Sequence, residues 1–251
     1  MSSEVQSVAR TLTIIEILAG NSEPTSLKEI AALSALPAPT AYRLLNTLAD
    51  RGYVDRLSNG SYKLSYKLLE LSSQNINTSS TVSTAKPYID DLSDRLGESA
   101  HLVVSDNTNV VYVYKVTKAV GSFQMASRIG MSLPMYRCAV GKAILSTYRD
   151  SDILKVLDAS NKVATTPFTL TDNLSILQQI YRVRETGYAI DDEENELGIK
   201  CFAAAIQPDK GPARYALSIS TFKSRLTELH SQEIIRAIKE TKQKIERAII
   251  V

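Results

Sequence analysis

Apolar residues recur every three or four positions at the start of the chain, which predicts an amphipathic helix over residues 5–18. A second helix is predicted to begin after Ser26, because Glu29 follows three residues later and the two side chains can form a capping box. Pro39 suits the first turn of a third helix, where its missing N–H is not needed. That helix is expected to end at residues 51–52, an Arg-Gly pair.

Two short runs of strand-forming residues, 53–57 and 61–65, flank Asn59 and Gly60. An Asn-Gly pair between two such runs is the strongest short signal of a tight hairpin. Three helices followed by a hairpin are the parts of a winged helix-turn-helix, with the hairpin as the wing. We therefore predict a winged helix-turn-helix domain over residues 1–65.

Helical periodicity resumes over residues 66–72, and a stretch rich in Ser, Thr and Asn follows over 74–83. Such polar stretches are typical of connections between folded parts. We interpret residues 66–80 as a linker helix, and 74–83 as a linker or frayed junction. Residues 81–251 then form the second domain.

The second domain mixes helices with strands. The predicted helices cover residues 82–96, 138–148, 152–157, 174–186 and 231–249. The predicted strands cover residues 100–105, 110–116, 123–128, 201–207 and 213–220. Strand runs bounded by helices indicate an antiparallel or mixed sheet with helices packed on it, so the fold class is α+β.

Composition narrows the picture further. Of the 251 residues, 44% are hydrophobic and 22% are charged, which excludes wholesale disorder and fibrous folds. The formal net charge of +2 does not by itself predict a nucleic-acid binder. The two cysteines form no CxxC pattern, and no signal-like segment or run of about 18 apolar residues is present. These features predict a cytoplasmic protein that does not enter a membrane.

The third helix is predicted to enter the major groove of double-stranded DNA with its N-terminal residues at the base edges. The candidates for base contacts are Thr40, Ala41, Tyr42, Arg43 and Asn46. Arg43 can fork onto a guanine, and the methyl group of Ala41 can touch a thymine methyl. Candidates on the first helix and the wing, for phosphate contacts or local positive charge, are Ser7, Arg10, Arg56, Ser58, Asn59 and Lys63.

Charge leaves two interpretations of this module open. Residues 1–72 hold seven basic and seven acidic side chains, so the same module could instead dock a protein. Arg43, Arg56 and Lys63 fall on the predicted reading helix and wing, whereas Glu16 and Glu23 fall on the opposite side. This distribution favours DNA.

Blocks along the chain resemble the IclR family of bacterial transcriptional regulators. In the first domain the matching blocks are residues 5–10 (VQSVAR), 42–45 (YRLL), 51–54 (RGYV) and 62–64 (YKL). In the second they are residues 127–130 (SRIG), 133–136 (LPMY), 141–143 (GKA), 187–189 (GYA), 192–201 (DEENELGIKC) and 218–220 (SIS). Their common order and spacing make the resemblance specific. Residues 38–40 (APT) depart from it, because the family commonly has Lys-Ser-Thr there.

The resemblance implies a winged helix-turn-helix, a linker helix and a C-terminal effector-binding domain with a GAF-like α/β fold. It also implies a homodimer or homotetramer that binds a palindromic operator and responds to a small organic acid. We expect a repressor, and a hydroxy or keto acid, such as a sugar acid, as its effector.

The resemblance nominates ten effector-binding residues: Ser122, Met125, Leu133, Ala139, Val140, Asp191, Ile199, Cys201, Ser218 and Ser220. Residues 139–141 would open a helix whose free N–H groups can hold a carboxylate, and Ser218 and Ser220 share one face of a strand. Asp191 can accept hydrogen bonds from ligand hydroxyls. Each also has a structural interpretation: the serines as small core residues, Cys201 as packing, and Asp191 as a turn cap.

Two other functions stay as alternatives. A small-acid enzyme could use Asp191, Cys138, Cys201 or His101, but neither His101 nor His230 stands in a catalytic motif. The spacing of these cysteines and histidines matches no zinc pattern. We therefore predict no enzyme activity, no metal and no cofactor. The second alternative is a metabolite sensor that acts through protein contacts, with the wing as its docking surface.

Overall fold

The computed structural model describes residues 4–77, 80–118 and 125–250. The chain forms two compact units, residues 1–78 and 79–251, and each is described by itself. Both contain helices and strands, so the predicted α+β class is confirmed. Among the described residues, every helix is too short or too polar to cross a lipid bilayer.

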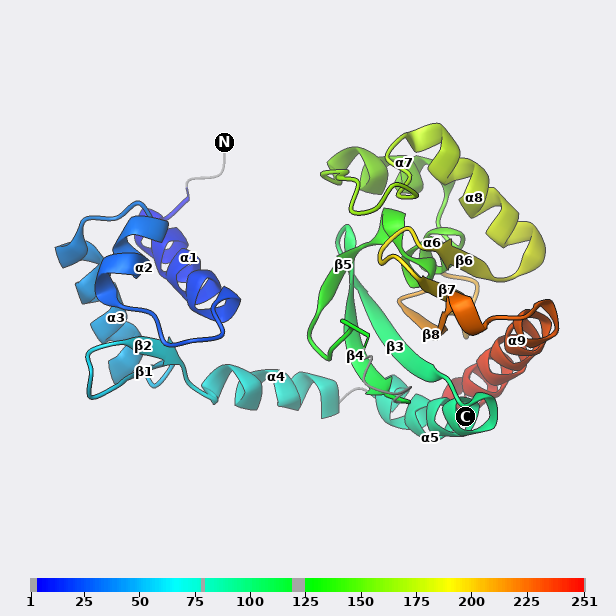
Figure 1. The fold of residues 1–251 in the computed structure, drawn as a ribbon, viewed down its shortest axis with the longest axis horizontal. Helices are drawn as coiled ribbons and strands as arrows, with labels where there is room; N and C mark the ends of the chain where they lie inside the picture. Colours follow the sequence, from blue (N-terminus) through cyan, green and yellow to red (C-terminus); the bar gives the residue numbers. More distant parts are fainter. Residues whose placement is uncertain (1–3, 78–79, 119–124, 251) are drawn as a thin grey trace. The chain divides into compact units, whose positions relative to one another are not determined.

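The first unit has three helices, a hairpin and a fourth helix (Figure 1). The elements are α1 Gln6–Gly20, α2 Leu27–Leu33, α3 Ala38–Asp50, β1 Val54–Arg56, β2 Tyr62–Leu64 and α4 Lys67–Asn77. Strands β1 and β2 pair antiparallel, which completes the predicted winged helix-turn-helix. The core joins all these elements except α4 through Ile14, Leu18, Ile30, Leu45, Leu48, Val54 and Tyr62.

Local sequence signals explain where the helices of this unit begin. Ser26 and Glu29 form the predicted capping box, which satisfies free N–H groups of α2. Pro39 lies in the first turn of α3, as predicted. Thr25 pairs with Tyr62 through two backbone hydrogen bonds of 2.8 and 2.9 Å, so the start of α2 is fixed to the wing.

The second unit is built on a six-stranded antiparallel sheet with the order β5-β4-β3-β8-β7-β6. The strands are β3 Ser99–Asp106, β4 Asn109–Val116, β5 Ser132–Pro134, β6 Ala189–Asp192, β7 Ile199–Ile206 and β8 Tyr215–Phe222. Strand β6 is therefore an edge of the sheet. Its position next to β7 brings residues 189–192 beside residues 200–203.

Helices cover both faces of this sheet (Figure 1). On one face lie α6 Ala139–Leu145, α7 Asp150–Ala159 and α8 Asn173–Thr186, which share one core with Ala203 and Ala205 of β7. On the other, α5 Ser80–Leu96 packs against α9 Glu228–Ile250. Two short 3-10 helices, Met135–Arg137 and Lys223–Arg225, precede α6 and α9.

Helix α6 lies in the interior, and all seven of its residues are buried. Gly141 allows this, because a Cβ atom there would lie 2.3 Å from the backbone of Met135. The helix can therefore turn back directly onto the 3-10 helix that precedes it.

Within the polar stretch 74–83, residues 74–77 belong to α4 and residues 80–83 to α5, so the described part of this stretch is helical and its role as a linker stays a prediction. One prediction about secondary structure is wrong. Residues 125–128 of the predicted strand 123–128 form no strand, and its first two residues lie outside the described ones.

Candidate functional site

Helix α3 presents a short row of side chains away from the core of the first unit. Tyr42 is 38% exposed and Arg43 is exposed, while Thr40 and Asn46 are half-buried. The prediction that Ala41 faces outward is wrong, because Ala41 is fully buried in the contact of α3 with the core. A side chain there cannot reach a base without unpacking the helix.

Arg56 of the wing links α3 to the hairpin. Its guanidinium carbon lies 5.9 Å from the ring centroid of Tyr42 and 5.9 Å from that of Tyr62. Cations at this distance from an aromatic face are attracted by the ring. Hydrogen bonds from the side chains of Asn46 and Arg56 lower the pKa of Tyr42. The wing and the exposed side of α3 therefore form one continuous polar surface.

The remaining DNA-contact candidates lie on exposed or partly exposed positions. Lys63 pairs with Asp55 at 3.9 Å across the hairpin, and both side chains are about half exposed. Ser58 and Asn59 are exposed in the turn, where Asn59 Oδ1 accepts a hydrogen bond from the Ser61 N–H at 3.0 Å. Ser7 is exposed and Arg10 is half-buried on α1.

In the second unit, six of the nominated effector residues line one cavity of about 30 Å³. They are Met125, Leu133, Asp191, Ile199, Cys201 and Ser220. Ala139, Val140 and Ser218 are buried nearby but do not line it. Ser122 lies outside the described residues. The cavity is also lined by residues that sequence reasoning missed: Tyr112, Ala126, Ser127, Met131, Asn195 and Glu196.

Strand register explains why distant residues meet at this cavity. Asp191 is the register partner of Cys201, and Cys201 is the partner of Ser220. Partners in an antiparallel sheet point to the same face, so the three side chains form a row across β6, β7 and β8. Cys201 Sγ lies 3.0 Å from Ser220 Oγ.

Asp191 is one of the titratable groups that line the cavity, together with Glu196, Cys201 and Tyr112. Its carboxylate is 3% exposed and accepts hydrogen bonds from the backbone N–H groups of Glu194 at 2.7 Å and Asn195 at 3.3 Å. Burial raises the pKa of Asp191 to about 7, against the opposing effect of the nearby Lys142 ammonium. Asp191 thus caps the turn at 193–195 and keeps its second oxygen for other partners.

A second polar network fixes the wall formed by Ser127. His101 Nε2 lies 3.0 Å from Ser127 Oγ, and its Nδ1 lies 3.4 Å from Ser218 Oγ. Lys115 Nζ donates to the Ser127 carbonyl. Burial and the Lys115 charge lower the pKa of His101 to about 3, so the imidazole stays neutral. His101 and Ser218 therefore hold the cavity wall in place rather than facing the cavity.

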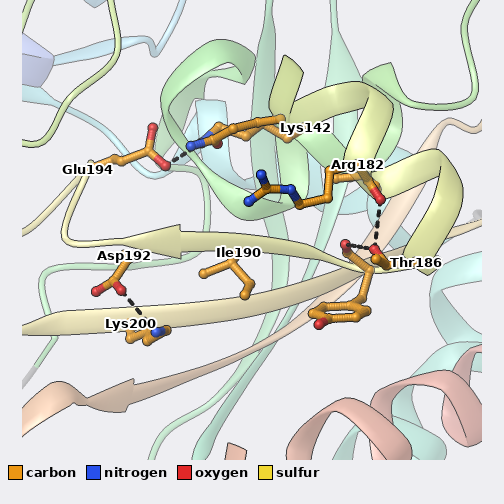
Figure 2. Close-up of a pocket in the computed structure, with 10 residues that line it drawn as sticks. Lys142, Arg182, Thr186, Ile190, Asp192, Glu194 and Lys200 are labelled. Atoms are coloured by element: carbon orange, nitrogen blue, oxygen red, sulfur yellow. Dashed lines mark hydrogen bonds and ion pairs between the residues drawn. The ribbon is translucent and has the colours of Figure 1, made fainter. Parts of the chain in front are cut away.

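Lys142 of α6 is a residue that sequence reasoning missed. Its ammonium group is fully enclosed and donates to Glu194 (Figure 2). It also donates to the side-chain oxygen of Gln179. A lysine within an otherwise apolar, buried helix is the sequence signal of such a pair, because burying an unpaired charge is strongly unfavourable. The pair anchors the turn at 193–195 from the side opposite to Asp191.

The cysteines and histidines do not form a metal site. Among the residues that the structure describes, no group of three or more His, Cys, Asp and Glu side chains is placed to hold an ion. Burial raises the pKa of Cys138 to about 12 and raises that of Cys201, so both thiols are protonated. Protonated thiols are poor nucleophiles and poor ligands.

A winged helix-turn-helix joined to a second domain is the arrangement of a DNA-binding regulator. Residues 7–58 match the IclR helix-turn-helix domain, and residues 72–247 match the C-terminal domain of bacterial transcriptional regulators of the IclR type. The chain therefore belongs to the IclR family of transcriptional regulators, as the sequence blocks predicted.

Individual relatives are similar to this chain over nearly its full length. The HTH-type transcriptional regulator XynR of Escherichia coli is 31% identical over 98% of this chain and 97% of its own. The transcriptional repressor YiaJ of E. coli is 30% identical over 96% of this chain and 86% of its own. The crystal structure of Thermotoga maritima IclR superposes with a TM-score of 0.77, at 29% identity over 97% of this chain and 98% of that one. These relatives are transcriptional regulators.

Proposed function

We propose that this chain is a transcriptional repressor whose affinity for a palindromic operator is controlled by a small organic acid. The observation that carries the proposal is the exposed side of α3, where Arg43 is exposed and the neighbouring Tyr42 lies next to the wing residue Arg56. An arginine near the start of a reading helix can bind a guanine through two hydrogen bonds. The repressors among the relatives, such as YiaJ, support repression rather than activation as the outcome of DNA binding.

The cavity beside Asp191 is the proposed effector site. Ser220, Ser127 and Asn195 offer hydrogen-bond donors for a carboxylate, and Leu133 and Ile199 offer apolar walls. The oxygens of Asp191 suit the hydroxyl groups of a hydroxy acid, such as a sugar acid. A volume of about 30 Å³ holds roughly one water molecule, so an acid can enter only if the walls separate. Binding would then favour one conformation over another, which is how a ligand changes DNA affinity.

The same proposal includes a homodimer or tetramer. Val8 and Leu12 lie at helical spacing on α1, and Val5 directly precedes the helix; the three side chains are 55%, 52% and 62% exposed. Such an apolar stripe fits a second copy of the chain, because a twofold dimer matches a palindromic operator. Residues 1–65 would read DNA, residues 66–80 would link the two parts, and residues 81–251 would bind the effector.

Gel retardation with the DNA upstream of the chain's own gene tests the operator proposal. We expect Arg43→Ala to abolish the sequence-specific complex, while Arg225→Ala, an exposed arginine of the second unit, leaves it unchanged. Sequence-specific binding that survives Arg43→Ala would overturn the assignment of the reading helix. The absence of any DNA complex with the parent protein would favour a sensor that acts through protein contacts.

A thermal-shift screen of small hydroxy and keto acids tests the effector site. We expect an acid that raises the melting temperature of the parent protein and does so less for Asp191→Ala and Ser220→Ala. An acid whose effect both variants retain would place the effector elsewhere. Chemical conversion of the bound acid would instead favour the enzyme alternative.

A further inference from the structure

A separate cleft of about 240 Å³ opens at the edge strand β6, where α8 passes over it (Figure 2). Gln179, Arg182 and Val183 reach it from α8, and Ile190 and Asp192 reach it from β6. Neither Asp191 nor Ser220 lines this cleft, so it is distinct from the cavity described above. It is also much larger than that cavity.

Among the described residues, the charged side chains around the cleft other than Arg182 form ion pairs, although the second carboxylate oxygen of Glu194, Oε2, is buried without a hydrogen-bond partner. Lys142 pairs with Glu194, and both Lys200 and Lys223 pair with Asp192. Arg182 has neither a carboxylate partner nor a side-chain hydrogen bond among the described residues. Figure 2 shows its guanidinium extending across the cleft toward Lys142 and Glu194. Arg182 thus offers an unpaired cation to the cleft, whereas the charge of Lys142 is compensated by Glu194, so an anion in the cleft would be attracted chiefly to Arg182.

The remaining walls indicate what kind of anion fits. The Gln179 carbonyl oxygen accepts from Lys142, and its side chain also bonds to the Glu194 carboxylate, which leaves one N–H of the Gln179 amide able to donate to a ligand. Val183, Ile190 and the ring of Tyr188 supply apolar surface. A guanidinium binds a carboxylate through two parallel hydrogen bonds, and apolar walls favour a carbon body over an inorganic ion.

We propose that the cleft between α8 and β6 is a second ligand site, which binds a small aliphatic carboxylate. Arg182 holds the carboxylate, Gln179 donates to it, and Val183, Ile190 and Tyr188 contact the aliphatic body. The enclosed Lys142 ammonium adds favourable potential at the inner end of the cleft without direct contact.

Occupation of this site acts on the effector cavity through Glu194, a consequence that rests on the proposed effector function. The Glu194 side chain is bound to Lys142 beside the cleft, and its backbone N–H is bound to Asp191 in the cavity. A carboxylate held by Arg182 repels the Glu194 carboxylate across the cleft, without contact to Lys142. Any shift of Glu194 then changes the hydrogen bonds of Asp191, so the two ligands alter each other's affinity.

Isothermal titration calorimetry of the full chain with isobutyrate tests the site without DNA or effector. We expect saturable binding that Arg182→Gln weakens about tenfold or more, the effect of losing one charged hydrogen-bonded pair. Arg225→Gln makes the same charge change at an exposed position outside the cleft and should leave the affinity unchanged. Isobutyramide, which lacks the charge, should not bind.

Three outcomes would overturn the second site. They are no saturable binding of isobutyrate, equal affinity in Arg182→Gln and parent protein, and loss of binding in Ser220→Ala instead. The last would assign isobutyrate to the effector cavity. Inorganic phosphate binding as tightly as isobutyrate would contradict the role of the apolar walls. If the effector screen finds no acid, the binding measurements with isobutyrate still stand. The effector proposal and the second-site proposal can therefore fail independently.

Discussion

The backbone N–H of Glu194 donates a 2.7 Å hydrogen bond to Asp191, while the Glu194 side chain forms an enclosed ion pair with Lys142. One residue therefore joins the polar cavity on β6 to the buried charge of α6. Thr166 and Thr169 hold the same turn through hydrogen bonds to the carbonyl groups of Glu193 and Glu194. A turn fixed from several sides transmits a displacement at one side chain to the others.

Asp191→Asn should change how stability depends on pH. The pKa of Asp191 is raised from 3.8 to about 7 in the folded protein, so the folded state holds a proton that the unfolded state releases. Its contribution to stability is therefore lost as pH rises from about 4 to about 7. Asparagine keeps the acceptor oxygen but has no charge. We expect the variant to gain on the order of 2 kcal/mol relative to the parent between about pH 5 and pH 8.

Urea unfolding of both proteins at several pH values measures this difference. His101 acts in the opposite direction, since its pKa is lowered to about 3 and its neutral form becomes more favourable as pH rises toward 6.5. That effect is present in both proteins and cancels in the comparison. A stability difference that does not vary with pH would contradict the raised pKa of Asp191.

Lys142→Met should destabilise the second unit by about 3–5 kcal/mol, because it leaves the buried Glu194 carboxylate without its cation. Burial already raises the pKa of Glu194, and the variant should raise it further. The double variant Lys142→Met/Glu194→Gln should recover much of the loss, because no charge then remains buried. Denaturant unfolding provides the measurement.

The matched control for the buried pair is Lys155→Met, which removes a lysine paired with Asp152 on the surface of α7. The Lys155 side chain is 77% exposed, so the expected change is below about 1 kcal/mol. Equal losses for Lys142→Met and Lys155→Met would show that enclosure of the pair has no energetic consequence.

Gly141→Ala should destabilise the fold by at least about 3 kcal/mol or prevent folding, because the added Cβ would lie 2.3 Å from the backbone of Met135. Gly20→Ala offers a comparison, since a Cβ there meets nothing within 4 Å. Alanine favours helix, so this change should be neutral or slightly stabilising. Thermal unfolding of the two variants distinguishes close packing from a general effect of replacing glycine, and similar melting temperatures would contradict the steric argument.

Arg56→Lys should weaken operator binding although it keeps the charge. A lysine ammonium lacks the planar guanidinium that lies against Tyr42 and Tyr62, so the wing loses its fixed position beside α3. We expect a loss of about tenfold in affinity, with the dependence on salt concentration unchanged because the number of charges is the same. Fluorescence anisotropy with labelled operator DNA measures both quantities.

Arg51→Lys is the control for this wing variant, because Arg51 is exposed at the end of α3 and touches neither tyrosine. Its affinity should match that of the parent protein. If Arg56→Lys binds as tightly as Arg51→Lys, the contacts with Tyr42 and Tyr62 do not position the wing.

The sequence predicted the first unit well because its signals are local. The capping box at Ser26 and Glu29, the proline in the first turn of α3 and the Asn59-Gly60 turn each depend on neighbouring residues. Ala41 shows the limit of this reasoning. Whether a given side chain of a helix faces the core depends on how the helices pack. The spacing of apolar residues does not by itself decide this for each single position.

The sequence predicted only part of the candidate effector site. The resemblance nominated Asp191, Cys201 and Ser220, and these residues do share one cavity. It also nominated Ala139, Val140 and Ser218, which lie in the packed layer behind that cavity. Tyr112, Ser127 and Asn195 were missed, because they come from segments that only the sheet and its connections bring together.

The sequence by itself determined most of the longer elements, the presence of a winged helix-turn-helix before a second domain, and the family. These depend on periodicity, turn residues and the order of short blocks, all of which are local along the chain. Only the tertiary structure decided that Lys142 meets Glu194 and that Asp191 lies in register with Cys201 and Ser220. Such contacts depend on strand order and on the burial of charge, which arise when segments far apart in the chain pack together.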